Sequence, residues 1–174
     1  MSKTKKLILS AMLLALSIVL SRFFSIKTQL LVISLNFIPI MLAAIWLGPK
    51  YSTLIAALSD LIGAILFPFG SYFPGFTVSA AITGFIYGIF LYKKPEEEMK
   101  NSSFLIRLII SSILSLGIVG LLLTSLWLHL LYGSAFLVVI SSRVLTQVIM
   151  LPIHVITMFL LEKALRPIVN KYLY

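Results

Sequence analysis

Four polar side chains interrupt the long apolar runs of this sequence: Asp60, Arg143, Gln147 and His154. An ionised Asp or Arg in the middle of a membrane helix costs about 2.5–3.5 kcal/mol, so each must face a partner or a watery cavity. The spacing of the last three places them on one face of a helix. The pattern predicts a polar-lined cavity between helices. Two alternatives stay open: Asp60 and Arg143 as a structural ion pair, and His154 as a hydrogen-bonded core histidine.

A second candidate feature is a loop rich in aromatic residues and proline. From Ser59 to Gly84 the sequence reads SDLIGAILFPFGSYFPGFTVSAAITG, with two Phe-Pro pairs close together. Proline ends or kinks a helix, so we expect a rigid loop that displays Phe67, Pro68, Phe69, Tyr72, Phe73 and Pro74. Such rings rest in the lipid interface or line a binding pocket, and the residues alone fit both interpretations.

Composition sets the class of protein to which these features belong. The chain has 174 residues, of which 60% are hydrophobic and 11% are charged, and this balance excludes an ordinary soluble domain. The formal charge of +9 does not indicate nucleic-acid binding, because the basic residues are scattered near the ends of apolar runs. The basic N-terminus resembles a signal peptide but lacks a convincing cleavage site before Arg22, so we expect it to be retained.

The apolar runs predict an all-α polytopic membrane protein with a single domain over residues 1–174. Six transmembrane helices are expected at about 6–24, 37–47, 51–66, 77–92, 103–131 and 135–166. Gly48-Pro49 is a strong helix stop between the second and third of these. Residues 25–36 are expected to form an outer, partly extended loop, and residues 93–102 an aqueous loop.

The positive charges predict how the protein is oriented. With the N-terminus in the cytoplasm, eleven of the fourteen Lys and Arg residues lie inside, Arg22 and Lys27 lie outside, and Arg143 is within the bundle. Because cytoplasmic loops carry the excess of positive charge, we expect a multi-pass cell-membrane protein with both termini in the cytoplasm. The aromatic loop, residues 25–36 and the turn at 132–134 then face outside.

The charges of the outer half also indicate the kind of ligand. Arg22, Lys27 and Arg143 outnumber the one acid there, Asp60, and Arg binds carboxylates through two parallel hydrogen bonds. Aromatic rings suit a flat heteroaromatic group. Trp127 and His129, near the outer end of the fifth helix, either belong to this pocket or anchor the helix at the interface. The candidate ligand-binding residues are Arg22, Lys27, Asp60, Phe67, Pro68, Phe69, Tyr72, Phe73, Pro74, Trp127, His129, Arg143 and Gln147.

The run from Leu47 to Tyr87 resembles the central motif of the folate-specific S components, the substrate-binding membrane subunits of energy-coupling factor (ECF) transporters. The FPFG…YFPGF doublet is its specific part, and LGP followed by SDLIGA supports it. Ala11 and Ala15 are similar to the alanine pair that S components present to their partner. The resemblance implies high-affinity capture of folate outside the cell and its inward delivery by reorientation on a membrane scaffold subunit driven by two ABC ATPases. Asp60 would then accept hydrogen bonds from the pterin.

Other features of the sequence reduce the number of possible functions but leave alternatives open. The sequence has no Walker motif, so the chain itself cannot hydrolyse ATP, and we expect neither enzyme activity, a cofactor nor a bound metal. Ala11 and Ala15 allow a close helix approach, either to a scaffold or within the chain, as Gly84 and Gly88 do. The alternatives are an S component for another anionic vitamin and an intramembrane enzyme of lipid or isoprenoid metabolism. The enzyme would need clustered acids or His at the cytoplasmic face, where only Glu162 and the Glu96–Glu98 run are available.

Overall fold

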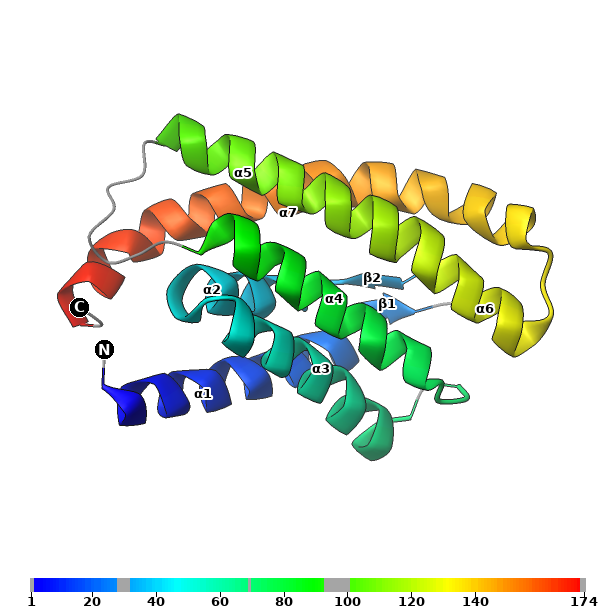
Figure 1. Cartoon of the computed structure of the whole chain (residues 1–174), viewed down its shortest axis with the longest axis horizontal. Coiled ribbons are helices and arrows are strands. Elements are labelled where there is room, and N and C mark those ends of the chain that lie inside the picture. The colour runs from blue at the N-terminus through cyan, green and yellow to red at the C-terminus, as the bar shows by residue number, and fades with distance from the viewer. Residues whose placement is uncertain (1, 28–31, 69, 93–100, 173–174) are drawn as a thin grey trace.

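The computed structural model of the chain describes residues 2–27, 32–68, 70–92 and 101–172, with side chains except at 26, 27, 32, 33 and 168–172. Its elements are α1 (Lys3–Arg22), β1 (Ser25–Lys27), β2 (Val32–Ser34), α2 (Phe37–Leu47), α3 (Pro49–Leu66), α4 (Pro74–Leu91), α5 (Asn101–Leu114), the π-helical segment η1 (Ser115–Leu123), α6 (Thr124–Tyr132) and α7 (Phe136–Tyr172). Figure 1 shows these helices as one elongated bundle. The predicted all-helical membrane fold is confirmed.

Several helix boundaries differ from the predicted ones. Helices α3 and α4 each begin two or three residues earlier than expected, at Pro49 and Pro74. Proline is favoured at the first position of a helix, because an N–H there has no hydrogen-bond partner within the helix and its absence costs nothing. Helix α1 ends at Arg22 and α7 continues to Tyr172. The predicted fifth helix is α5, η1 and α6 in direct succession.

Residues 25–27 and 32–34 form a short antiparallel hairpin in which Ser25 pairs with Ser34. This pairing agrees with the expected partly extended outer loop. The next element, α2, has only 11 residues, which at 1.5 Å each is too short to cross a hydrocarbon core of about 30 Å. Nine of its residues are buried, so α2 is a core helix around which the longer helices pack.

Among the described residues, four segments are long and apolar enough to span a membrane: Lys3–Arg22, Pro74–Leu91, Asn101–Tyr132 and Phe136–Pro167. Helix α3 is not among them, because it carries Lys50, several hydroxyl side chains and Asp60. It is instead packed tightly on α4. Ser52 Oγ donates to the Gly84 carbonyl at 2.8 Å, and a Cβ on Gly84 would come within 2.4 Å of the Ser52 backbone oxygen. The Gly84/Gly88 pattern is therefore used inside the chain.

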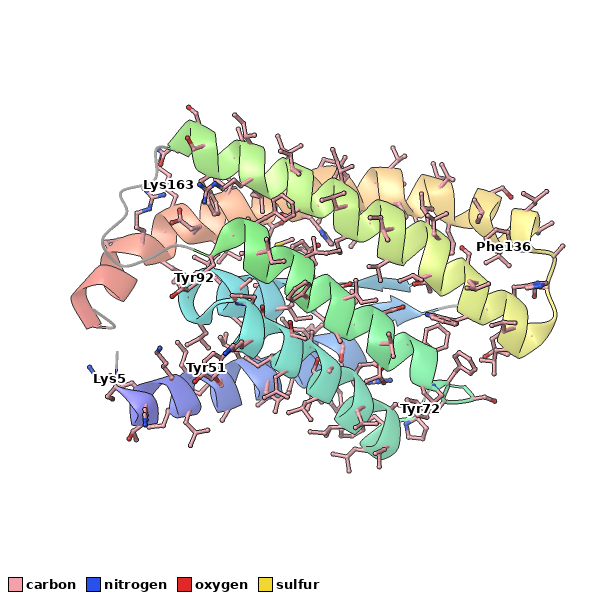
Figure 2. All side chains as sticks on the ribbon, in the orientation of Figure 1. Lys5, Tyr51, Tyr72, Tyr92, Phe136 and Lys163 are labelled. Atoms are coloured by element: carbon pink, nitrogen blue, oxygen red, sulfur yellow. The ribbon has the colours of Figure 1, made fainter. Side chains whose placement is uncertain are left out.

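The two ends of the bundle differ in character. Both chain termini lie at one end in Figure 1, and the α3–α4 loop and the α6–α7 turn lie at the other. Figure 2 places Lys5, Tyr51, Tyr92 and Lys163 toward the end with the termini, and Tyr72 and Phe136 toward the opposite end. At the end with the termini, the buried Glu162 accepts two hydrogen bonds from Arg166, which also donates to Asn101 of α5.

Candidate ligand-binding site

A cavity of about 610 Å³ lies between the helices. Small-molecule sites typically occupy about 300–1,000 Å³ and combine apolar walls with a few placed polar groups. The walls here come from α1, β2, α2, α3, α4, η1, α6, α7 and the α3–α4 loop. Its larger polar and aromatic lining residues are Arg22, Asn36, Phe37, Asp60, Tyr72, Phe76, Tyr87, Tyr132, Arg143, Gln147 and His154.

Five of the predicted binding residues line this cavity: Arg22, Asp60, Tyr72, Arg143 and Gln147. Six others are not in its lining: Phe67, Pro68, Phe73, Pro74, Trp127 and His129. Phe69 and the side chain of Lys27 lie outside the described residues. Among the predicted residues whose side chains the structure describes, it therefore brings together two arginines, one aspartate and one glutamine, with one ring from the loop.

Arg22 ties the end of α1 to α3. Its two terminal nitrogens donate to the carbonyl oxygens of Asp60 and Phe67, each at 3.3 Å. The guanidinium passes close over Gly63, where a Cβ would lie 2.6 Å from Arg22 Nε. That Nε is buried and has no hydrogen-bond partner among the described residues. The contacts hold a cation beside the carboxylate-bearing part of α3.

Asp60 is held by α4 rather than by loop backbone. Its Oδ2 accepts a 2.7 Å hydrogen bond from Thr77 Oγ1, which lies 3.0 Å from the Tyr72 hydroxyl. A carboxylate has about four acceptor positions on its two oxygens, so the bond from Thr77 leaves capacity for a ligand donor. Tyr72, Thr77 and Asp60 thus connect the aromatic loop to the cavity wall.

Helix α7 supplies the opposite polar wall. Arg143 is only 8% exposed, and its Nε donates to the Gly120 carbonyl of η1 at 3.0 Å. Gln147, one turn further along α7, packs its amide against Gly120. As the sequence predicted, the two side chains share a face, and this face is directed into the bundle.

His154 lies deeper along α7 and has partners on two sides. Its Nδ1 is 3.2 Å from the Tyr87 hydroxyl, and its ring stacks on Phe37 with centroids 3.8 Å apart. His154 is thus a buried, hydrogen-bonded histidine and also part of the cavity lining. Tyr87 and Phe37 were not singled out in the sequence, since an aromatic residue inside an apolar helix carries no signal that separates a lining position from a core position.

The rings of the aromatic loop divide into two groups. Phe73 packs on Trp127 at 5.6 Å between centroids, and Trp127 Nε1 donates to Ser79 Oγ at 2.8 Å. Phe67 packs on Phe23 at 5.3 Å. These rings hold the loop against α1 and α6, whereas Tyr72 and Phe76 face the cavity. The loop also approaches α6 across the cavity, because a Cβ on Gly70 would lie 3.3 Å from the Tyr132 hydroxyl.

The arrangement suits an anionic ligand with a flat aromatic part. Two arginines stand on different walls of the cavity, one carboxylate can accept from ring N–H groups, and aromatic side chains lie between them.

Comparisons with known proteins agree on the type of protein. Residues 1–167 match the family model described as "ECF-type riboflavin transporter, S component". The chain is 37% identical over 159 residues to the folate transporter FolT of Clostridium novyi (strain NT), covering 91% of this chain and 88% of that one. It is 38% identical over 165 residues to the folate transporter FolT of Leuconostoc mesenteroides subsp. mesenteroides, covering 91% and 85%. A crystal structure of FolT bound with folic acid superimposes with a TM-score of 0.82 at 38% identity, covering 92% of this chain and 94% of that chain.

Proposed function

The chain belongs to the family of S components of ECF-type transporters, and from this premise we propose that it is the folate-binding subunit of such a transporter. It captures folate outside the cell and delivers it inward by reorienting on an ATP-driven scaffold. It is a transport protein and not an enzyme.

The observation that carries this proposal is the charge of the cavity. Folate combines a flat pterin, a benzoyl ring and two glutamate carboxylates. Arg22 and Arg143 provide cationic forks for carboxylates, and Asp60 provides an acceptor for the amino and ring N–H groups of the pterin. Tyr72 and Phe76 supply aromatic faces in the lining of the cavity.

Riboflavin is the second candidate ligand, since the matching family model is named for riboflavin transport. Riboflavin is also flat and aromatic, but it carries no carboxylate. The guanidinium groups of Arg22 and Arg143 would then face a neutral ligand that has no carboxylate to pair with them. The charge of the cavity favours folate.

Calorimetric titration of the purified chain in detergent tests this choice. We expect folic acid to bind with a Kd of about 1 µM or lower, corresponding to at least about 8 kcal/mol, and riboflavin to bind far more weakly. The same titration with each vitamin on a chain carrying Arg143→Met and Arg22→Met serves as the charge control. Tighter binding of riboflavin, or folate binding that survives the loss of both arginines, would contradict the proposal.

The scaffold subunit is proposed to dock on α1. Ala11 and Ala15 are exposed on this helix, next to Leu7, Met12 and Leu16. Only 11% of the apolar window of α1 is buried within the bundle. Small residues four apart allow another helix to approach closely, so this face is suited to a helical partner in the membrane. Two ABC ATPases would drive that scaffold.

Both termini are proposed to lie in the cytoplasm. They share one end of the bundle in Figure 1, where Lys5 and Lys163 are also found in Figure 2. An excess of Lys and Arg marks the cytoplasmic side of a cell-membrane protein. The aromatic loop then faces outside, where the ligand enters.

A further inference from the structure

The middle of the long helix from Asn101 to Tyr132 is π-helical. Segment η1 covers the nine residues Ser115–Leu123, and the N–H of Thr124 bonds to the Val119 carbonyl five residues back. Such wide turns are rare and often occur at functional sites. Ser115, Leu116 and Gly120 bring this segment to the cavity wall, opposite the polar face of α7.

Gly120 contacts both polar side chains of that face. Its carbonyl accepts the 3.0 Å hydrogen bond from Arg143 Nε. A Cβ at this position would lie 2.6 Å from Gln147 Nε2 and 2.9 Å from its Cδ. Because Gly120 has no side chain, the Gln147 amide can pack against its Cα. The Gly120 carbonyl oxygen holds Arg143 through the hydrogen bond from Nε.

The Arg143 bond has a directional consequence. A guanidinium is planar and rigid, so fixing Nε fixes the plane in which its terminal N–H groups point. Carboxylate recognition through two parallel hydrogen bonds depends on that plane. The carbonyl of Gly120 is thus in a position to control how well the α7 wall receives an anion.

We propose that Gly120 is a positioning residue for ligand affinity, acting through Arg143 and Gln147. The proposal rests on the proposed function in that folate is taken as the ligand. It assigns a role to η1: the π-helical turn presents a backbone oxygen to Arg143 and leaves room at position 120 for the Gln147 amide.

Gly120→Ala separates this role from a role in folding. The atoms that an added Cβ meets belong to the end of a flexible side chain, so they can move without disturbing the bundle. Alanine also favours helix over glycine. We therefore expect the unliganded variant to melt no lower than the parent protein. Ligand affinity should nevertheless fall, because the Gln147 amide must leave its place beside Arg143.

Gly117 offers a matched control in the same π-helical segment. A Cβ on Gly117 would meet nothing within 4 Å, and Gly117 does not line the cavity. Gly117→Ala makes the same chemical change with the same gain in helix propensity. It should leave folate binding as it is.

The experiment titrates folic acid into the parent chain, Gly120→Ala and Gly117→Ala, each also combined with Gln147→Ala. This second substitution removes the amide that a Cβ at position 120 would displace, while the Gly120 carbonyl and Arg143 stay as they are. We expect Gly120→Ala to raise the Kd by about tenfold or more and Gly117→Ala by less than about twofold. In the Gln147→Ala background, Gly120→Ala should cost clearly less than in the parent, since the amide that the added Cβ displaces is gone.

The outcomes distinguish this inference from the proposed function. Failure of the parent chain to bind folic acid overturns the proposed function and this inference with it. Normal folate binding by the parent together with an unchanged Kd for Gly120→Ala overturns the inference alone. A lowered melting temperature of unliganded Gly120→Ala, an equal loss in Gly117→Ala, or full additivity with Gln147→Ala would assign Gly120 to the fold and not to the site.

Discussion

The charged side chains of the cavity are held in place by the protein itself. Thr77 donates to the Asp60 carboxylate, Arg22 donates to the backbone carbonyls of Asp60 and Phe67, and Arg143 donates to the carbonyl of Gly120. Ordering a long side chain during binding costs about 0.5–1.5 kcal/mol, and these contacts remove much of that cost before the ligand arrives. A pre-formed site of this kind favours high affinity.

The first prediction concerns Asp60. Asparagine at this position has the same shape, and its carbonyl can still accept the hydrogen bond from Thr77, so the local structure should persist. It cannot accept from pterin N–H groups as a charged carboxylate does. We expect Asp60→Asn to weaken folic acid binding by about 1.5–3 kcal/mol, or roughly 10- to 150-fold, measured by titration of the purified chain.

Glu162 provides the matched control for Asp60. It is a buried acid at the other end of the molecule, where its partner is Arg166. Glu162→Gln makes the same carboxylate-to-amide change far from the cavity, and should leave the Kd for folic acid unchanged. Full folate affinity in Asp60→Asn would remove Asp60 from the list of ligand contacts.

The role of a single residue could be predicted where a polar side chain lies within an apolar helix. Asp60, Arg143 and Gln147 are costly in lipid, so the sequence alone placed them facing a cavity, and the structure has them in its lining. Tyr87 and Phe37 could not be found in this way, because rings are as suitable for a core as for a pocket. Phe73 and Trp127 were predicted as ligand contacts on the same ambiguous signal, and the structure packs them on each other.

At the scale of elements, the residues that end a helix could be recognised in the sequence, whereas a departure from α-helical geometry could not. Gly48, with φ of 87°, and Pro49 separate α2 from α3 as expected. The π-helical segment η1 has no sequence signal of its own, because its apolar residues fit an α-helix equally well. In the structure the widened turn lies beside α7, with Arg143 and Gln147 against Gly120.

The second prediction concerns the exposed face of α1. Replacing Ala11 and Ala15 with leucine fills the space that a partner helix needs, so co-purification of the scaffold subunit and its ATPases should be lost. Folic acid binding by the isolated chain should be unchanged, because neither residue lines the cavity. Affinity purification of the tagged chain from cells that express all the subunits measures the first effect, and titration measures the second.

Val144 and Val148 supply the control for this face. They are an exposed pair four residues apart on α7, and leucine at both positions also adds bulk to a lipid-accessible surface. We expect the α7 variant to assemble normally. Retained assembly of the Ala11→Leu/Ala15→Leu variant, or equal losses in both variants, would contradict docking through α1.

At the scale of the whole molecule, the two ends of the bundle differ in charge and in which of them carries the loop that lines the cavity. The binding cavity is lined by the α3–α4 loop, and the termini with their lysines lie at the far end (Figures 1 and 2). A ligand that enters past Tyr72 must therefore come from the side opposite the termini. The cation bias in the sequence predicts that the end with the termini is cytoplasmic, and this orientation stays a prediction.

The third prediction tests that orientation. The chain has no cysteine, so a single introduced thiol can be followed without background. Ser71, in the exposed aromatic loop, and Lys163, exposed on α7, mark the two ends. A membrane-impermeant maleimide should label Ser71→Cys in intact cells and Lys163→Cys only after the membrane is permeabilised, while the parent chain gives no signal. Because Ser71 lines the cavity, folic acid should also slow labelling at that site but not at Lys163. Labelling of Lys163→Cys in intact cells would reverse the orientation, and it would place the α3–α4 loop that lines the cavity on the cytoplasmic side.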